Sequence, residues 1–362
     1  MTSGTADPAR ADIIDRIRAA AADKLPLRIR AGGTKDFYGE TLAGDIVDVR
    51  SLNGIVAYAP AELVITARAG TTLEEIEKAL AEHGQMLAFE PPHHGVAATL
   101  GGIVACGFSG PRRAQAGAVR DFVLGVRIID GTGEPLAFGG QVIKNVAGFD
   151  VSRLMTGALG TLGVLTEISL KTLPRPRRET TRVIECDGAS ALRRVNEWGG
   201  KPLPVSATCY IEGRLWVRLS GAAAGITAAT RDIGGDEVDG TLFWPSIRDQ
   251  THARFATSMR NDATLWRLSV RSTAPWLEIA GEQIVEWGGA LRWVVTTDGA
   301  AGSTLRAWAA TNGGHAALYR GNDKSAGAFQ PLAPPLLALH RRLKDVFDPH
   351  RILNRGRLFA EI

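Results

Sequence analysis

The segment Arg28–Gly39, RIRAGGTKDFYG, places a glycine-rich turn directly after a short strand that we expect at residues 27–30. A second glycine cluster, TLGG, follows at residues 99–102. Glycine accepts positive φ and lets the main chain approach a ligand closely, so two such turns can present many N–H donors to one concave surface. That surface suits the pyrophosphate of a dinucleotide, with the hydroxyls of Thr34 and Ser109 nearby. Taken alone, each cluster is more simply explained as a pair of tight turns.

A nicotinamide site of the Rossmann type is excluded by the spacing of the glycines. No GxGxxG opens a helix after a strand with an acidic residue about 20 positions further on. The segment GALGTLG at residues 157–163 has a different spacing, and no GxxxxGK[ST] phosphate loop occurs. A dinucleotide held by this chain therefore requires another fold.

The first half of the chain alternates helical and strand patterns. Asp7 is a good N-cap for a helix starting at Pro8, and Thr72 with Glu75 forms the capping box of a second helix that Gly84 ends. A further helical pattern covers residues 151–159. Short strands are expected at residues 27–30, 46–49, 63–67, 122–129 and 163–171. The fold is therefore mixed α and β.

A change of character occurs at residues 173–178, LPRPRR, where two prolines and three arginines interrupt any regular element and indicate an exposed linker. After it the pattern reads strand, helix, strand, strand, helix, at residues 182–185, 191–198, 206–211, 215–219 and 222–233. This pattern is typical of a compact α+β domain. A last helix is expected at residues 335–347, before the turn pair Asp348-Pro349.

Composition indicates an ordinary globular protein of about two domains, since 45% of the 362 residues are hydrophobic and 22% are charged. A net charge of +4 with scattered arginines argues against nucleic acid as a partner. No apolar run approaches the roughly 20 residues of a membrane span, and residues 1–10 have no export pattern, so we expect a cytoplasmic protein. Cys106, Cys186 and Cys209 are widely spaced, which predicts neither a disulfide framework nor a metal site within the chain. Any metal cluster would then belong to a partner.

Six segments, taken in order, resemble the FAD-binding domain of the vanillyl-alcohol-oxidase or FAD-linked oxidase family. They are RIRAGGTKDFYG (28–39), TARAGTTL (66–73), TLGG (99–102), VRDFVLGVRIIDG (119–131), KNVAGFD (144–150) and GTLGVLTEISLKTL (160–173). A seventh, KDVFDPHRILNRGRL (344–358), is similar to the C-terminal return of that family to the flavin. The resemblance covers residues 20–175, and the order of the segments is more specific than any one of them.

The resemblance implies an α+β protein with a two-subdomain PCMH-type FAD-binding fold and a small α+β cap domain. The expected divisions are residues 1–175 for the FAD-binding domain, 176–330 for a reduced cap, and 331–362 for a segment returning to the FAD domain. By this resemblance, the first glycine loop would wrap the pyrophosphate and residues 106–109 would lie along the flavin edge. The main chain of Val164 would hydrogen-bond to the adenine, and Asn354 would lie near the flavin ring. The expected cofactor-binding residues are Ala31, Gly32, Gly33, Thr34, Lys35, Pro92, Thr99, Leu100, Gly101, Gly102, Cys106, Gly107, Ser109, Gly160, Gly163, Val164 and Asn354.

Whether FAD is attached covalently is predicted from one residue, Thr34. Some members of the family bind FAD covalently through a histidine in the first glycine loop, and Thr34 stands at that place here. We therefore expect non-covalent FAD.

The segments FEPPHHG (89–95) and CGFSGPRR (106–113), and the short chain, resemble the small FAD-binding subunits of bacterial glycolate oxidases. Such a subunit implies two partners, a larger FAD-containing hydroxyacid dehydrogenase subunit and an iron–sulfur subunit, with peripheral membrane association only through the complex. The longer 2-hydroxyacid dehydrogenases carry a histidine and acidic motif in a larger substrate domain. Residues 176–330 contain only His252 and His315 and no paired motif, so no catalytic residue is assigned.

Several other residues allow two interpretations. His93 and His94 fit a polar loop better than a general base, and Arg112 and Arg113 fit a surface or subunit interface better than a carboxylate site. Lys35 fits either a phosphate contact or a solvated position. Six tryptophans of the second half fit a protein interface and a core equally well, at positions Trp198, Trp216, Trp244, Trp266, Trp287 and Trp293.

Three functions remain open at this level. The first is an FAD subunit of a glycolate (2-hydroxyacid) oxidase or dehydrogenase complex, which takes part in electron transfer through flavin to an iron–sulfur partner. The second is a self-sufficient FAD-dependent alcohol or hydroxyacid oxidoreductase. The third is an assembly subunit with a vestigial FAD site.

Overall fold

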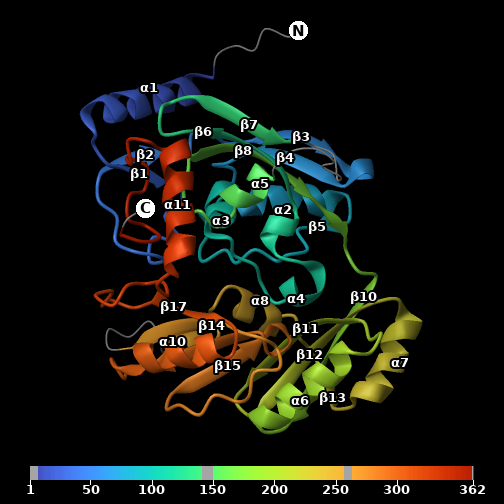
Figure 1. Ribbon diagram of the computed structural model, residues 1–362. Coiled ribbons are helices and arrows are strands. Elements are labelled where there is room, and N and C mark those ends of the chain that lie inside the picture. Colours follow the sequence, from blue (N-terminus) through green and yellow to red (C-terminus); the bar gives the residue numbers. More distant parts are fainter. Residues whose placement is uncertain (1–6, 141–149, 257–262, 361) are drawn as a thin grey trace.

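Two large antiparallel sheets face each other across a layer of short helices (Figure 1). The computed structural model describes residues 7–140, 150–256, 263–360 and 362. Helices and strands occur in both halves of the chain, which confirms the α+β class. The segment KNVAGFD lies outside the described residues except for Asp150, which is the N-cap of helix α5 (Val151–Met155).

The N-terminal part is a helix on a two-stranded parallel sheet. Helix α1 (Pro8–Asp23) begins as predicted at Asp7, whose side chain accepts a hydrogen bond from the N–H of Ala9 at 3.2 Å. The helix buries Ile13 and Ile17 against β1 (Leu27–Arg30) and β2 (Asp45–Asp48). The first glycine-rich loop follows β1 directly.

A five-stranded sheet forms the centre of the N-terminal half, in the order β3-β4-β8-β6-β7. Its strands are β3 (Ile55–Ala59), β4 (Val64–Arg68), β6 (Val123–Ile129), β7 (Pro135–Gly139) and β8 (Val164–Lys171). Its inner side is covered by the helices α2 (Leu73–Glu82), α3 (Leu100–Cys106) and α5, whereas α4 (Arg113–Ala116) packs against the second sheet (Figure 1). Thr72 caps α2 as predicted, because its hydroxyl accepts a hydrogen bond from the N–H of Glu75 at 3.2 Å.

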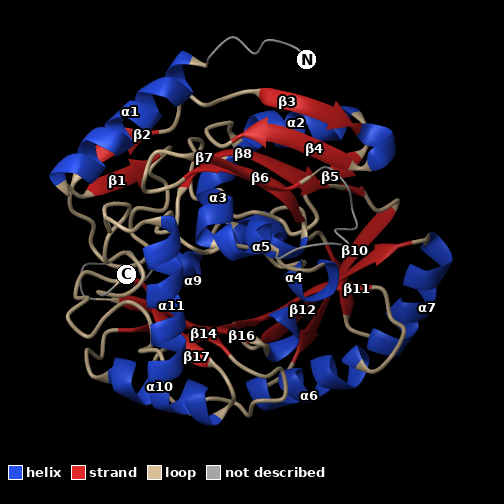
Figure 2. Cartoon of the chain, turned by 45° about the horizontal axis from the view of Figure 1, so that its top comes forward, coloured by secondary structure: helices blue, strands red, loops and turns tan. Residues whose placement is uncertain are grey.

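An eight-stranded sheet forms the second half, in the order β13-β10-β12-β11-β15-β16-β14-β17. Its strands are β10 (Arg178–Glu185), β11 (Val205–Ile211), β12 (Arg214–Gly221), β13 (Asp236–Val238), β14 (Thr264–Ser269), β15 (Glu282–Glu286), β16 (Leu291–Thr296) and β17 (His315–Arg320). Figure 2 shows α6 (Gly188–Gly199), α7 (Ala223–Ile233) and α10 (Ala301–Thr311) on its outer face. The short helices α8 (Phe243–Arg248) and α9 (Ala253–Ala256) and the turn η4 (Trp287–Gly289) complete it.

The segment between the sheets is not a free linker along its whole length. Leu173–Pro174 forms the short strand β9, which pairs with β5 (Gln85–Met86), and β10 starts at Arg178. The prediction that two prolines exclude regular structure there was therefore wrong for its first residues. Proline has no N–H group to donate to a neighbouring strand. It is tolerated in β9 because this two-residue strand is an edge strand.

The C-terminal segment returns to the N-terminal half. Helix α11 (Pro334–Phe347) ends at a buried ion pair in which the ammonium of Lys344 lies 2.7 Å from the carboxylate of Asp348. The same ammonium donates to the carbonyls of Thr161 and Leu353, at 2.7 and 2.8 Å. This contact joins α11, the start of β8 and the final segment at one point.

One apolar core runs through both halves. It contains residues of the helical layer, such as Phe108, and of the eight-stranded sheet, such as Trp293 and Tyr319. The expected domain limits at residues 175 and 330 remain a prediction, since the two sheets share this core.

Candidate functional site

A narrow cleft of about 110 Å³ lies where the first glycine loop, α3, the start of β8 and the C-terminal segment meet. Twelve of the residues expected to hold a cofactor line it, namely Ala31, Gly32, Gly33, Thr34, Lys35, Thr99, Gly101, Gly102, Cys106, Gly160, Gly163 and Asn354. They come from parts of the chain as far apart as Ala31 and Asn354. The fold thus brings them to one place.

The other five expected residues lie elsewhere. The side chains of Leu100 and Val164 are buried in apolar cores, and Gly107 ends α3 with a φ of 68°. Pro92 and Ser109 line a separate small cavity beside Glu286 and Trp287, and the hydroxyl of Ser109 accepts a hydrogen bond from the N–H of Val119 at 2.9 Å. A contact with the cofactor stays a prediction for all five.

The glycine loop has the donor set that a pyrophosphate requires. Gly33 adopts a φ of +70°, which favours glycine. The main-chain N–H groups of residues 32–35 donate to no acceptor among the described parts of the chain, whereas the loop is closed by the bond from the N–H of Asp36 to the carbonyl of Gly33. Consecutive unpaired N–H groups in such a turn form an anion-binding concavity. The residues present therefore fit a bound diphosphate.

The opposite wall of the cleft is built by close main-chain packing. The N–H of Gly101 donates to the carbonyl of Ala69 at 2.7 Å, and the hydroxyl of Thr99 accepts from the N–H of Gly102 at 3.2 Å. A β-carbon at Gly101 would lie 2.8 Å from the β-carbon of Ala69. Glycine is required there because any side chain would push α3 away from β4.

Asn354 lines the cleft, but both polar atoms of its side chain are hydrogen-bonded to main-chain groups of the protein. Its Oδ1 accepts from the N–H of Ile29 at 2.8 Å, and its Nδ2 donates to the carbonyl of Leu159 at 2.6 Å. Its φ of 41° lies in the left-handed region, where asparagine is tolerated better than most residues. Asn354 therefore positions the glycine loop against the turn at Gly160, and the expected contact with a flavin ring stays a prediction.

Arg357 is a wall residue that sequence reasoning missed. Its guanidinium donates to the carbonyls of Lys35, Asp36 and Glu40, at 3.3, 3.1 and 2.8 Å, and so fixes the glycine loop from the C-terminal side. It lies within the segment KDVFDPHRILNRGRL (344–358), of which only Asn354 was expected to contact the cofactor. The further wall residues that were missed are Ile29, Arg30, Asp36, Leu42, Val49, Ala69, Ala105, Leu159 and Leu165. Most of these are ordinary apolar positions that no motif distinguishes.

Lys35 is 7% exposed, which excludes the alternative of a solvated position, and its contact with a phosphate stays a prediction. Its ammonium donates to the hydroxyl of Thr34 at 3.1 Å and lies 3.5 Å from the carbonyl of His93. Burial lowers the pKa of Lys35, with opposing contributions from Cys106 and Asp249. Burial also raises the pKa of the Cys106 thiol to about 11, against the effect of Lys35 and Arg357. The thiol at the cleft is therefore protonated at neutral pH.

A second, larger cavity of about 1050 Å³ adjoins the cleft, and Thr34 lines both. His93 and His94 lie in its wall. His93 contacts the carboxylate of Glu77 at 3.2 Å, whereas His94 Nε2 lies 3.0 Å from the hydroxyl of Tyr319. Burial, together with Lys35 and Arg320, lowers the pKa of His94 to about 3. His94 is thus a neutral side chain that lies half-buried in a loop and is hydrogen-bonded to Tyr319.

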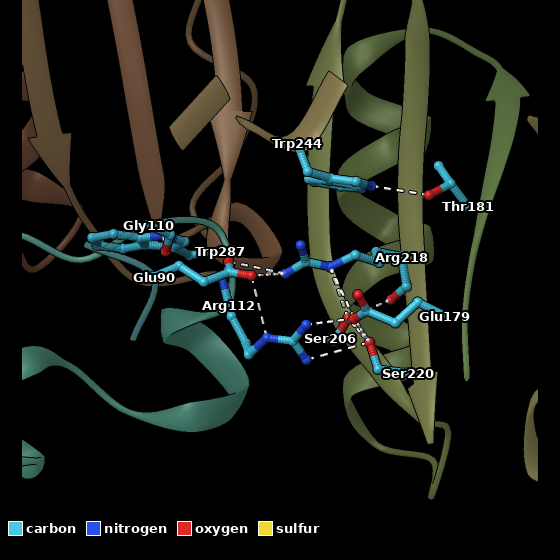
Figure 3. A network of polar contacts seen from close by, with 10 residues as sticks. All are labelled: Glu90, Gly110, Arg112, Glu179, Thr181, Ser206, Arg218, Ser220, Trp244 and Trp287. Carbon is cyan, nitrogen blue, oxygen red and sulfur yellow. Dashed lines mark hydrogen bonds and ion pairs between the residues drawn. The ribbon is translucent and has the colours of Figure 1, made fainter. Parts of the chain in front are cut away.

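A buried network of charges joins the two halves (Figure 3). Glu90 accepts hydrogen bonds from Arg112 and from Arg218, whose Nη2 lies 2.9 Å from the Glu90 carboxylate. Arg112 also contacts Glu179 at 2.5 Å. The hydroxyls of Ser206 and Ser220 complete the network. Arg112 is 7% exposed, so its assignment to the surface or to a subunit interface was wrong.

The six tryptophans considered above belong to the core of this chain. Five of the six are 5–6% exposed, and the sixth, Trp216, stacks on Phe243 with ring centroids 3.7 Å apart. Their polar groups are satisfied internally, as in the bond from Trp287 Nε1 to the carbonyl of Gly110 at 2.9 Å. Arg113 places its guanidinium 4.3 Å from the centre of the Trp287 ring. The structure thus favours the core reading of these residues.

One buried carboxyl group in this region predicts a pH-dependent stability. Burial raises the pKa of Glu286 to about 7, although the bond from Trp293 Nε1 at 2.7 Å opposes the shift. The folded protein then holds a proton that the unfolded chain releases near pH 4.5, so stability falls as the pH rises from 4.5 to 7 and is constant above. Glu286→Gln should remove this fall and be more stable than the parent at pH 8 by roughly 3 kcal/mol. Urea unfolding at pH 5 and pH 8 measures the free energy of unfolding of both proteins, and Glu278→Gln, which changes an exposed glutamate, is the control. If the free energy changed with pH in the same way in Glu286→Gln and in the parent, the prediction would be contradicted.

The fold and the cleft define the class to which the chain belongs. Residues 9–139 match the family model described as an FAD binding domain, and residues 321–358 match the C-terminal domain of FAD linked oxidases. A solved structure of alkyldihydroxyacetonephosphate synthase superposes with a TM-score of 0.67 at 15% identity, over 95% of this chain and 75% of that one. The PCMH-type FAD-binding fold and FAD as the cofactor are thereby confirmed.

One relative matches this chain over almost the whole length of both proteins. Glycolate oxidase subunit GlcE of Escherichia coli K12 is 47% identical over 97% of both chains. The chain therefore belongs to the FAD-linked oxidase family, together with this glycolate oxidase subunit, and is an FAD-linked oxidoreductase. D-lactate dehydrogenase of Archaeoglobus fulgidus is 29% identical over 60% of this chain and 51% of its own length. Glycolate oxidase subunit GlcD of Bacillus subtilis is 28% identical over 50% and 39%.

Among the described residues, no helix is both long enough and apolar enough to cross a membrane. In the same parts of the chain, no group of three or more histidine, cysteine, aspartate or glutamate side chains could hold a metal ion, and the three cysteines are free thiols.

Proposed function

We propose that this chain is the FAD-binding subunit of a glycolate (2-hydroxyacid) oxidase or dehydrogenase complex, in which it takes part in electron transfer to an iron–sulfur subunit. The observation that carries the proposal is the 47% identity to a protein named as a glycolate oxidase subunit, over almost the whole of both chains. The partial relationship to subunit GlcD supports a larger FAD-containing subunit as the second partner. Association with the membrane would occur through these partners.

In this proposal the chain contributes binding and orientation. The N–H groups of residues 32–35 hold the diphosphate, and Arg357 and Asn354 keep the glycine loop against the start of β8. FAD, when bound, accepts electrons from a hydroxyacid and can release them singly to a metal cluster. Cys106, which lines the cleft, carries a protonated thiol and therefore does not repel a diphosphate. Because Thr34 stands where some members of the family carry the histidine that attaches flavin, we expect the cofactor to be held without a covalent bond.

The test is purification of the tagged chain from its native host, followed by absorption spectra before and after anaerobic addition of glycolate. We expect a yellow protein that brings down a larger flavoprotein and an iron–sulfur protein, with flavin bleaching in the complex. Acid precipitation should release all of the flavin into the supernatant. A lone chain that is fully active with glycolate would overturn the assignment to a complex, and a colourless chain unable to take up FAD would overturn the role of the cleft.

A further inference from the structure

Helix α11 carries a second row of apolar side chains on the side that faces away from the core. Leu336, Leu339 and Val346 are 44%, 45% and 72% exposed, whereas Lys344 and Phe347 are buried on the other side. At 3.6 residues per turn, positions 339 and 346 lie above one another on the helix, and position 336 lies beside them. In Figure 1 no other element lies in front of α11. This exposed row is therefore open to solvent.

The exposed row differs from the other exposed apolar residues because its members are gathered on one helix. The remaining large apolar side chains that are exposed in the described parts of the chain are single residues of different segments, such as Val56 of β3 and Leu242 before α8. Single exposed apolar residues are normal on a protein surface. A helix that only covers a core needs one apolar side. The second apolar side of α11 therefore indicates a contact with another molecule.

The charges around the exposed row are mostly positive. Residues 334–360 contain six arginine or lysine residues and two aspartates, and both aspartates are ion-paired within this segment, with Lys344 and Arg351. Arg341, Arg342 and Arg355 are exposed. Arginine beside apolar residues, without lysine or glutamate, is the composition of the centre of a protein interface. A membrane-surface helix would instead carry aromatic residues on its apolar side, and the exposed side of α11 has none. The row thus fits an apolar protein surface with carboxylates at its margin.

The inner side of α11 lies against the walls of the cofactor cleft. The ammonium of Lys344 donates to the carbonyls of Thr161 and Leu353. These residues are the sequence neighbours of Gly160 and Asn354, which line the cleft. The thickness of one helix, about 10 Å, therefore separates the exposed row from the cleft wall. A protein that covers the row lies close to the cofactor, and the rate of electron transfer falls steeply with distance.

We propose that the exposed side of α11 is the docking surface for the iron–sulfur subunit. That subunit would receive Leu339 and Val346 in an apolar groove and place a carboxylate against Arg342, as in other complexes in which one helix lies in a groove. The inference rests on the proposed function for the existence of this subunit. It adds the surface of contact, and it places α11 between the cofactor cleft and the metal cluster.

The test is purification of the tagged chain and its variants from the native host, followed by measurement of iron and acid-labile sulfide per tagged chain. We expect the parent to bring down a chain that carries both. Leu339→Asp, which puts a charge into the row, and Arg342→Glu, which reverses the charge beside it, should each lower the bound iron at least about tenfold. Leu242→Asp, which changes a more exposed leucine elsewhere, should keep the iron of the parent. The FAD content of each variant purified alone should be unchanged.

The outcomes separate this inference from the proposed function. Equal iron content in the parent and in both α11 variants would overturn the docking surface alone, whereas a parent that brings down no iron–sulfur chain would contradict the proposed function and the inference with it. A photo-crosslinking amino acid in place of Val346 should become joined to the iron–sulfur chain, as identified by mass spectrometry. This crosslink decides the question if circular dichroism shows that Leu339→Asp does not fold.

Three results would assign the exposed row to another occupant and so contradict the inference. The first is a crosslink from position 346 to a second copy of this chain, and the second is a crosslink to the larger flavoprotein. The third is binding of the lone chain to phosphatidylglycerol vesicles that Leu339→Asp abolishes, since a membrane would then be the partner of α11.

Discussion

Gly32→Ala is expected to lower the affinity of the chain for FAD by at least about tenfold. A β-carbon at position 32 would lie 1.6 Å from the carbonyl oxygen of Ala97, far inside van der Waals contact. The atom that it meets is main chain, so the loop after β1 must move as a whole. Its four unpaired N–H groups would then no longer converge on a diphosphate. Flavin content per chain and FAD titration of the apoprotein measure the effect.

The matched control is Gly225→Ala on the exposed face of α7. A β-carbon there meets nothing within 4 Å, and alanine is the better helix former, so stability should rise slightly and FAD binding should not change. Full flavin content in Gly32→Ala would show that the loop is not part of the cofactor site. A general loss of structure is distinguished by circular dichroism and by the unfolding midpoint of the apoprotein.

Arg218→Met is expected to destabilise the chain by about 3 kcal/mol or more. The side chain of Arg218 is 8% exposed, and its removal leaves Glu90 with Arg112 as its remaining cation in a buried site. Losing one member of a buried network is costly because the opposite charge stays desolvated. Urea unfolding at pH 7 gives the difference in free energy. Arg214→Met, on the same strand but with a 55% exposed side chain, is the control and should change stability little.

The same network makes the parent sensitive to acid. Burial by itself raises the pKa of Glu179, but the Ser220 hydroxyl and the guanidinium groups of Arg218 and Arg112 outweigh it and hold the pKa below 4.5. A carboxyl group with a lowered folded-state pKa contributes stability above its unfolded-state pKa, and this is lost as the pH falls through the folded value. Arg218→Met should therefore lose less additional stability than the parent between pH 5 and pH 3. A steeper acid loss in the variant would contradict this account.

Local sequence signals predicted the elements of the first half well, for identifiable physical reasons. Asp7 and Thr72 cap their helices through side-chain bonds that depend only on nearby residues. The glycine loops were found because positive φ and close main-chain packing restrict a position to glycine. Asn354 and Arg357 show the limit of such signals, since their roles come from contacts with Ile29 and Lys35, more than three hundred residues away.

The second half was harder to predict for the same reason. Five of its eight strands, β13 to β17, gave no pattern that was recognised. β13 is only three residues long, and β14 to β17 contain runs of buried residues that do not alternate with polar ones. All six residues of β16 are buried, including Arg292. Arg112 was assigned to the surface or to a subunit interface, because nothing near it in sequence reveals that Glu90 and Glu179 approach from other elements.

The bond between Ile29 and Asn354 has a consequence for how the chain is made. Its two partners are separated by 325 residues, and the N–H of Leu27 likewise donates to the carbonyl of Ile352. At a synthesis rate of roughly 5–20 residues per second, β1 emerges from the ribosome tens of seconds before the residues that complete it. During that interval the glycine loop lacks the contacts that position it. If the cleft holds the cofactor as proposed, we expect stable flavin binding only after residue 357 has been synthesised and has left the ribosome.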